Sequence, residues 1–391
     1  MFFILRCLGL LLLGATQVAQ ALPFRPTADG QVLERLRTNP TDPVYQELRA
    51  LRAKLAQSPQ DLALAVHLAQ RYIEQGRILS DPRYNGYAQA VLAPWWNQPE
   101  PPPEVLVLRA TLRQSAHDFP LALADLDRVL KQNPDDPQAL ITRATILQVQ
   151  GDYPEAKRAC AHLFQHTTDL VLFTCLGGVA GLNGQAHSAV TLLQQGLTRS
   201  PQATTGEKNW ALTTLAEIYQ RLGQSERAEV YFKQALALVP DSYLLGAYAD
   251  FLLDQGRAKD VVALLHNQTR ADGLLLRLTL AEKVLKSTSF PQHLAALQDR
   301  FAASRLRKDS SHRREEARFT LHLLNQPRAA LELAVQNWQV QREPADARLV
   351  LQTALASGDR KAAQPALQWL KESRLEDVQL AQLQQQLEVR P

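Results

Sequence analysis

The chain has 391 residues, of which 46% are hydrophobic and 21% are charged, and its formal net charge is +4. An apolar fraction of this size indicates a folded protein and argues against an intrinsically disordered one. The small positive charge is spread along the chain, so the sequence offers no basic domain of the kind that binds nucleic acid.

Residues 1–21 have the organisation of a secretory signal peptide. Arg6 supplies the positive charge, residues 7–15 are an uncharged and largely apolar stretch, and Ala19 and Ala21 form a small-x-small cleavage site. The apolar stretch is shorter than the roughly 20 residues that a spanning helix needs. We therefore expect export to the periplasm and cleavage after Ala21, with no integral membrane span left in the mature chain. An uncleaved N-terminal anchor is the alternative.

Residues 22–61 are expected to form a lead and a capping helix. The lead is rich in proline over residues 22–26, and the apolar pattern predicts a helix over residues 42–57. Terminal elements of a helical array must cover its exposed end. We therefore expect this helix to cap the array that follows.

The rest of the chain has the pattern of helical hairpins that follow one another about every 34 residues. In the clearest copy, residues 209–241, the first helix is expected to end at Gly223. The other residues that mark this copy are Leu212, Leu215, Ala216, Tyr219, Ala228, Phe232, Ala235 and Pro240. Gly151, Gly184 and Gly256 occupy the place of Gly223 in other copies, where glycine favours the left-handed turn that ends a helix.

This order of residues resembles the tetratricopeptide repeat (TPR), over about residues 62–373 and most strongly over residues 103–273. The resemblance implies an all-α fold, a right-handed α-solenoid of about nine stacked helical hairpins with capping helices at its ends. We assign TPR-like repeats to residues 62–273. Residues 274–391 are expected to hold degenerate repeats and a final capping helix over residues 376–389.

In this family the first helices of successive hairpins line a concave groove that binds a protein or peptide partner. The resemblance places these residues on the groove: Trp210, Thr213, Glu217, Arg221, Tyr243, Asp250 and Asp254. Trp210 and Tyr243 occupy equivalent places in adjacent repeats, so the two rings could support an extended peptide or a helix. The alternative is that either ring packs back onto its own repeat joint, and that the charged residues form a solvated face.

The first hairpin departs from the pattern. Its first helix is expected to end at Gly76, and residues 78–87 are inserted before the second helix. Loops inserted into repeats often carry the specific contact, so Arg83, Tyr84 and Tyr87 are a second candidate set of partner-binding residues. The alternative is that the aromatic residues only cover the flank of the first hairpin.

Cys160 and Cys175 are the only cysteines that remain after signal cleavage. The repeat resemblance places them on consecutive helices that pack together, and an exported protein meets oxidising conditions, so they are a candidate disulfide. Two buried thiols are the alternative. His162 and His166 share a helix face close to Cys160, which raises a further alternative: an accessory subunit, or a metal or cofactor chaperone, that uses both cysteines and both histidines.

Residues 305–318 contain the densest run of basic residues, which Glu315 and Glu316 partly neutralise. Such a run could attract an anionic polymer, a membrane surface or an acidic partner. A solvated linker between two helices is the alternative.

A serine elbow, a phosphate loop and a dinucleotide fingerprint are all missing from the sequence. We therefore expect a protein that is not an enzyme, with no cofactor, no metal and no nucleic-acid partner. The function that fits best is a periplasmic TPR scaffold or adaptor, which binds a protein partner in envelope assembly, secretion or maturation.

Overall fold

The computed structural model describes residues 28, 30, 31 and 41–389 of the chain. The expected signal peptide therefore lies outside the described residues. The chain divides into two units, Met1–Arg37 and Thr38–Pro391, and every helix described below belongs to the second unit.

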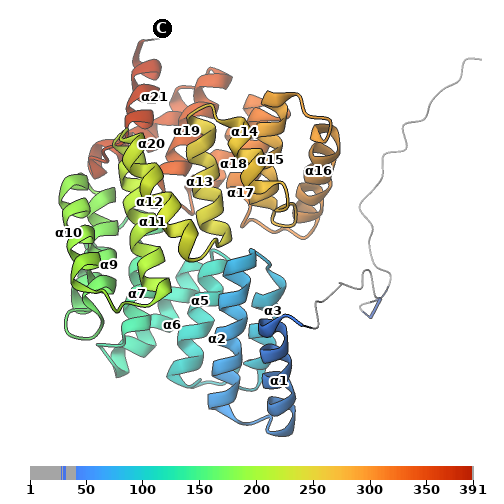
Figure 1. Cartoon of the computed structure of the whole chain (residues 1–391), viewed down its shortest axis with the longest axis vertical. Helices are drawn as coiled ribbons and strands as arrows, with labels where there is room; N and C mark the ends of the chain where they lie inside the picture. Colours follow the sequence, from blue (N-terminus) through green and yellow to red (C-terminus); the bar gives the residue numbers. More distant parts are fainter. Residues whose placement is uncertain (1–27, 29, 32–40, 390–391) are drawn as a thin grey trace, which may run out of the picture. The chain divides into compact units, whose positions relative to one another are not determined.

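Helices of the second unit pack as consecutive pairs, and the described residues contain no strand (Figure 1). The pairs, in chain order, are α2 (Leu62–Leu79) with α3 (Arg83–Val91), α5 (Pro103–Ser115) with α6 (Phe119–Gln132), α7 (Pro137–Gln150) with α8 (Tyr153–His162), α9 (Asp169–Leu182) with α10 (Ala186–Arg199), α11 (Thr205–Arg221) with α12 (Ser225–Leu238), α13 (Ser242–Asp254) with α14 (Ala258–Leu265), α15 (Asp272–Leu285) with α16 (Phe290–Leu306), α17 (Arg313–His322) with α18 (Pro327–Trp338), and α19 (Pro344–Ser357) with η1 (Lys361–Ala363) and α20 (Gln364–Ser373). The predicted all-α array of about nine hairpins is confirmed.

Single helices flank these hairpins. α1 (Pro43–Gln57) precedes the first hairpin and α21 (Val378–Val389) follows the last, while the short α4 (Ala93–Trp96) comes after α3. The helix expected over residues 42–57 is thus present, with Asp42 as its N-cap. None of the helices in the described part combines the length and the apolar character that a membrane crossing requires.

Local sequence signals explain where most helices begin and end. Asp136 accepts a hydrogen bond from the N–H of Ala139 at 2.8 Å, and Pro137 occupies the first position of α7, where a missing N–H costs nothing. Gly151 ends the same helix with a φ of 80°. The other glycines that take the left-handed conformation after a first helix are Gly184, Gly223, Gly256 and Gly358. The glycine ends predicted at Gly151, Gly184, Gly223 and Gly256 are therefore confirmed.

The first hairpin corrects one prediction. α2 does not end at Gly76 but continues to Leu79, and Ser80 takes the left-handed turn with a φ of 50°. Gly76 is buried, and a Cβ at this position would lie 3.1 Å from the Cβ of Tyr84. Glycine is therefore placed here for the close approach of α3, and not to end the helix. Most of the inserted residues belong to α2 and α3, so they do not form a long loop.

The degenerate part of the sequence folds into the same kind of hairpin without a glycine at every turn. α15 ends at Leu285, and Lys286 takes a left-handed φ of 53°. A residue other than glycine in this conformation costs about 1 kcal/mol or more. Burial of Leu274, Leu275 and Leu276 in the core offsets this cost, which explains why a helix pair forms where the local pattern is weak.

The hydrophobic core does more than join neighbouring hairpins. One cluster combines Leu140 and Leu172 of the early repeats with Val350, Leu351 and Leu380 near the C-terminus. α19 contributes buried residues on most of its sides, namely Ala347, Leu349, Val350, Leu351, Thr353 and Ala354. The C-terminal repeats therefore pack back onto the earlier ones and share their core.

Polar contacts between distant segments accompany this packing. The N–H of Arg342 donates to the carbonyl oxygen of Val149 at 2.7 Å, and the N–H of Ala186 donates to Glu376 at 2.7 Å. α13 lies against α2, where the hydroxyl of Ser242 donates to the carbonyl oxygen of Ile78 at 2.9 Å. The sixth hairpin thus lies against the first. The final helix α21 packs on α19 of the last hairpin, and its Val378 also lies against Gly223 of the fifth hairpin.

Candidate functional site

The structure joins Cys160 and Cys175 by a disulfide with an S–S distance of 2.00 Å. Both residues are buried in the core cluster that the C-terminal repeats share. Because both sulfur atoms are bonded to each other, they cannot act as thiolate ligands, and His166 lies 3.5 Å from the carboxylate of Asp135. Within the described residues, no three side chains of metal-binding type are grouped together. The disulfide therefore contradicts the alternative of a metal site that uses both cysteines as ligands.

The two aromatic residues assigned to the groove have different surroundings. Trp210 is half-buried and packs against the core cluster that contains the C-terminal repeats. Tyr243 is 65% exposed, and its hydroxyl donates a hydrogen bond to Glu217 at 2.6 Å. One ring is therefore part of the packing between repeats, whereas the other ring is open to a partner.

The acidic residues assigned to the groove bind arginines of the later repeats. Asp250 accepts hydrogen bonds from Arg277 of α15 and from Arg318 of α17, the latter at 2.6 Å. Asp254 accepts two hydrogen bonds from Arg348 of α19, and Figure 1 shows α19 beside α13. The chain's own helices therefore occupy this part of the groove, and these carboxylates are not a solvated face.

Three groove residues remain, namely Glu217, Arg221 and Thr213. Burial raises the pKa of Glu217, although the positive charge of Arg221 opposes this shift. The negative charge of Glu217 raises the pKa of Tyr243 well above its usual value. Thr213 is buried and its hydroxyl donates to the carbonyl oxygen of Asn209, so it is not available to a partner.

The residues expected on an inserted loop belong to a compact aromatic cluster. Arg83 begins α3 and donates to Asp81 at 2.9 Å. The rings of Tyr84 and Tyr87 lie 6.1 and 5.5 Å from the ring of Tyr72, measured between centroids. Tyr84 is half-buried and covers the first hairpin, while Tyr87 remains exposed.

Three arginines of the basic run over residues 305–318 pair with carboxylates of this chain, and polymer or membrane binding through the run stays a prediction. Arg305 is paired with Glu316, and Arg318 is paired with Asp250. Arg314 donates to Asp346 and Glu343 of the last hairpin, and these negative charges raise its pKa against the opposing effect of burial. Arg314 and Arg318 therefore join α17 to carboxylates of other hairpins.

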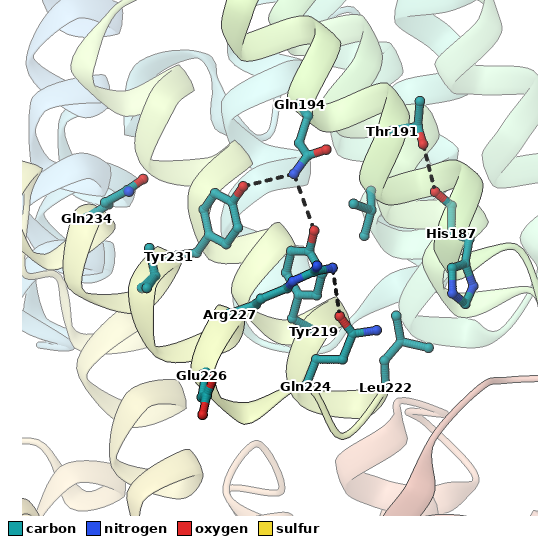
Figure 2. Close-up of a pocket in the computed structure, with 12 residues that line it drawn as sticks. His187, Thr191, Gln194, Tyr219, Leu222, Gln224, Glu226, Arg227, Tyr231 and Gln234 are labelled. Carbon is teal, nitrogen blue, oxygen red and sulfur yellow. Dashed lines mark hydrogen bonds between the residues drawn. The ribbon is translucent and has the colours of Figure 1, made fainter.

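A separate hollow lies between the second helices of the fourth and fifth hairpins (Figure 2). We call it the outer cleft, and its volume is about 790 Å³. The helices α10 and α12 form its two walls with side chains in matching order: His187, Val190, Thr191 and Gln194 on α10, and Arg227, Val230, Tyr231 and Gln234 on α12. Spacings of three, four and seven residues place each set on one helix face.

Two tyrosines and a glutamine organise one end of the outer cleft. The rings of Tyr219 and Tyr231 are stacked, with centroids 5.5 Å apart and planes at 6°. The side-chain amide of Gln194 donates to both hydroxyl oxygens, at 3.3 Å to Tyr219 and 3.0 Å to Tyr231 (Figure 2). The guanidinium of Arg227 lies over the ring of Tyr219 at 5.6 Å, a cation–π contact. These contacts fix the side chains that a ligand would meet.

The outer cleft was not among the sites predicted from the sequence. In the sequence, each wall has the pattern of an ordinary solvent-facing side of a second helix, because it contains one valine among polar residues. The available signal was the repetition of the same stripe on both helices, in which Val190 corresponds to Val230 and Gln194 to Gln234.

No protein-family model matches the chain, and no curated protein matches it either. Solved structures do match. A tetratricopeptide repeat protein from Parabacteroides merdae is 15% identical, with a TM-score of 0.43 over 61% of this chain and 92% of that chain. A Rap protein in complex with competence and sporulation factor is 15% identical, with a TM-score of 0.45 over 88% and 96% of the two chains.

The APC/C hetero-tetramer Cut9–Hcn1 gives a TM-score of 0.50 at 13% identity, over 84% of this chain and 63% of that chain. At these identities the likeness concerns the fold alone. It agrees with the consecutive helix pairs and with the left-handed glycines that end their first helices. The chain therefore has an all-α, TPR-like solenoid fold.

Proposed function

We propose that this chain is an exported scaffold without catalytic activity, which binds a protein partner through the part of its inner surface around Tyr243. The observation that carries the proposal is the exposure of this ring, which is 65%. Tyrosine is enriched at the centres of protein interfaces because it combines a large apolar ring with a hydroxyl. The hydrogen bond to Glu217 fixes the ring before a partner arrives.

The filled groove restricts the kind of partner. Arg318 and Arg348 bind the acidic groove residues, so a long peptide cannot lie along this part of the groove. A partner would instead insert a short protruding segment or a loop toward Tyr243. Preorganised sites of this kind lose little conformational entropy on binding.

Export to the periplasm, and a role in envelope assembly, secretion or maturation, are part of the proposal. The charge, apolar stretch and cleavage site of residues 1–21 support export. The disulfide between two buried cysteines also supports it, because disulfides persist in oxidising compartments. N-terminal sequencing of the protein from the envelope fraction tests this part, and a chain that still carries residues 1–21 would contradict cleavage.

The partner site is tested by placing a photo-crosslinking amino acid at Glu217 or Arg221 in the full-length chain, expressed in its own host. The matched control carries the same amino acid at Val284, which is 68% exposed on α15. The proposal expects one protein to be captured from the inner positions and not from position 284, and expects Tyr243→Ala to abolish the capture. Equal capture at all positions, or capture that Tyr243→Ala leaves unchanged, would overturn it.

A further inference from the structure

We infer that the outer cleft is a second binding site, separate from the surface around Tyr243, and that it takes an extended, uncharged peptide segment. The main chain of that segment would hydrogen-bond to the end of the cleft that holds Gln194 and Tyr231. One apolar side chain of the segment would enter the other end, between Val190 and Val230.

The hydrogen-bonding groups favour an extended peptide. Gln194 donates to the hydroxyl oxygens of Tyr219 and Tyr231, so the more exposed hydroxyl of Tyr231 keeps its hydrogen for another acceptor. The carbonyl oxygen of Gln194 and the amide of Gln234 add an acceptor and further donors on the two walls. An extended peptide presents a free N–H and C=O at nearly every residue, whereas a helix uses these groups internally. The groups of the cleft therefore match an extended backbone better than a helical one.

The dimensions agree with a short segment. The stripe from His187 to Gln194 spans about 10 Å of helix at roughly 1.5 Å per residue. An extended chain rises about 3.3 Å per residue, so about three residues of peptide fit along the wall. The volume of about 790 Å³ falls within the range of sites that bury most of a small ligand.

The side chains of the cleft favour an uncharged ligand. Val190 and Leu222 are half-buried and Val230 is 53% exposed, so together they offer an apolar surface to one inserted side chain. Glu226 and Arg227 are adjacent and carry opposite charges at the same end of the cleft. A charged ligand would gain attraction from one and repulsion from the other, whereas an apolar or amide side chain loses nothing.

The test uses the purified mature chain, residues 22–391, and a displayed library of linear heptapeptides as the probe. Tyr231→Phe removes one hydroxyl and keeps the stacked ring, and Val230→Asp places a charge between the walls. Val284→Asp is the matched control, because Val284 is also an exposed valine on a helix, at 68%. Thermal unfolding midpoints within the error of the wild type show that each variant is folded.

The inference expects selected peptides with an apolar residue near the centre and uncharged neighbours. Tyr231→Phe should weaken their binding roughly two- to tenfold, as the loss of one hydrogen bond predicts. Val230→Asp should weaken it at least about tenfold, and Val284→Asp should leave it unchanged. A library that yields no binder, or peptides that bind Val230→Asp as well as the wild type, would overturn the inference.

Its failure is distinguishable from failure of the proposed function, because the two sites use different residues. Photo-crosslinking from Glu217 reports on the surface around Tyr243, whereas peptide binding with the Val230→Asp variant reports on the outer cleft. Some peptides could block photo-crosslinking from Glu217 and still bind the Val230→Asp variant as tightly as the wild type. This result would place peptide binding at the inner surface and refute the outer site.

Discussion

The guanidinium of Arg348 donates two hydrogen bonds to the carboxylate of Asp254, at 2.9 and 2.7 Å, across 94 positions of the chain. One residue belongs to the last hairpin and the other to the sixth, on helices whose facing surfaces would form a groove in an open repeat array. The pair therefore marks where the C-terminal repeats lie against the inner surface of the earlier ones.

Arg348→Ala should lower the free energy of unfolding by about 2 kcal/mol, because Asp254 would remain buried without its charged partner. Arg143→Ala is the matched control. Its arginine is 28% exposed against 34% for Arg348, but its partner Asp127 is 63% exposed against 9% for Asp254. The control should lose less than about 1 kcal/mol. Urea unfolding measures the free energy of unfolding of both variants. Equal decreases would show that burial of the partner carboxylate does not matter here.

Gly181→Ala should destabilise the fold by about 1–3 kcal/mol through overpacking. A Cβ at this position would lie 2.8 Å from the Cδ1 of Ile218, which is fully buried and cannot move aside. Gly86→Ala is the control, because nothing lies within 4 Å of its Cβ position on α3. Alanine there should stabilise the protein by roughly 0.5–1 kcal/mol. Thermal unfolding of the two variants should give shifts of opposite sign, and a stabilised Gly181→Ala would contradict the packing.

Stability should fall in acid partly because of His322. Burial lowers its pKa to about 4, and the positive charges of Arg318 and Arg348 add to the effect. The unfolded chain takes up a proton below about pH 6.5, whereas the folded chain does not, so stability is lost as the pH falls from about 6.5 toward 4. The slope from this residue is at most about 1.4 kcal/mol per pH unit.

His322→Gln should therefore flatten the stability profile between pH 6.5 and 4, as measured by urea unfolding at each pH. Carboxylates such as Glu229, whose pKa is lowered to about 2 by the hydrogen bond from Arg257, lose their contribution at lower pH in both proteins. A profile that keeps its slope in the variant would assign the acid sensitivity to other groups.

Replacing both cysteines, as Cys160→Ala with Cys175→Ala, should cost about 3 kcal/mol for a loop of this size. The two residues are 15 positions apart and buried, so the bond constrains α8 against α9 inside the shared core. Guanidinium unfolding with and without reductant measures the effect. Reductant should lower the stability of the wild type and leave the double variant unchanged, and a wild type insensitive to reductant after unfolding would count against the bond.

Local signals were enough to predict most of the helix pairs. Asp136, Pro137 and Gly151 act through neighbouring backbone groups, so their effect can be read from a few adjacent residues. Gly76 misled the prediction because the same residue type serves two purposes, an end of a helix or a close approach between helices. Only the position of Tyr84 in space distinguishes them.

The occupation of the groove could not be predicted in the same way. Asp250 and Asp254 lie in a clear repeat, whereas Arg318 and Arg348 lie in degenerate ones. Neither pattern predicts which residues meet across the groove. A period of about 34 residues specifies how neighbouring hairpins stack. It does not specify how far the array turns before its end meets its inner surface, because small rotations at each joint add up over many repeats.

The contact of Ser242 with Ile78, together with the bond from Arg342 to Val149, has a consequence for how such a protein can evolve. An open solenoid can gain or lose a hairpin by duplication or deletion, since each repeat touches only its neighbours. Here an added hairpin between these partners would displace the later repeats along the superhelix and separate Arg348 from Asp254. These contacts and the pair of Arg348 with Asp254 can therefore form together only with the present number of repeats between the two ends.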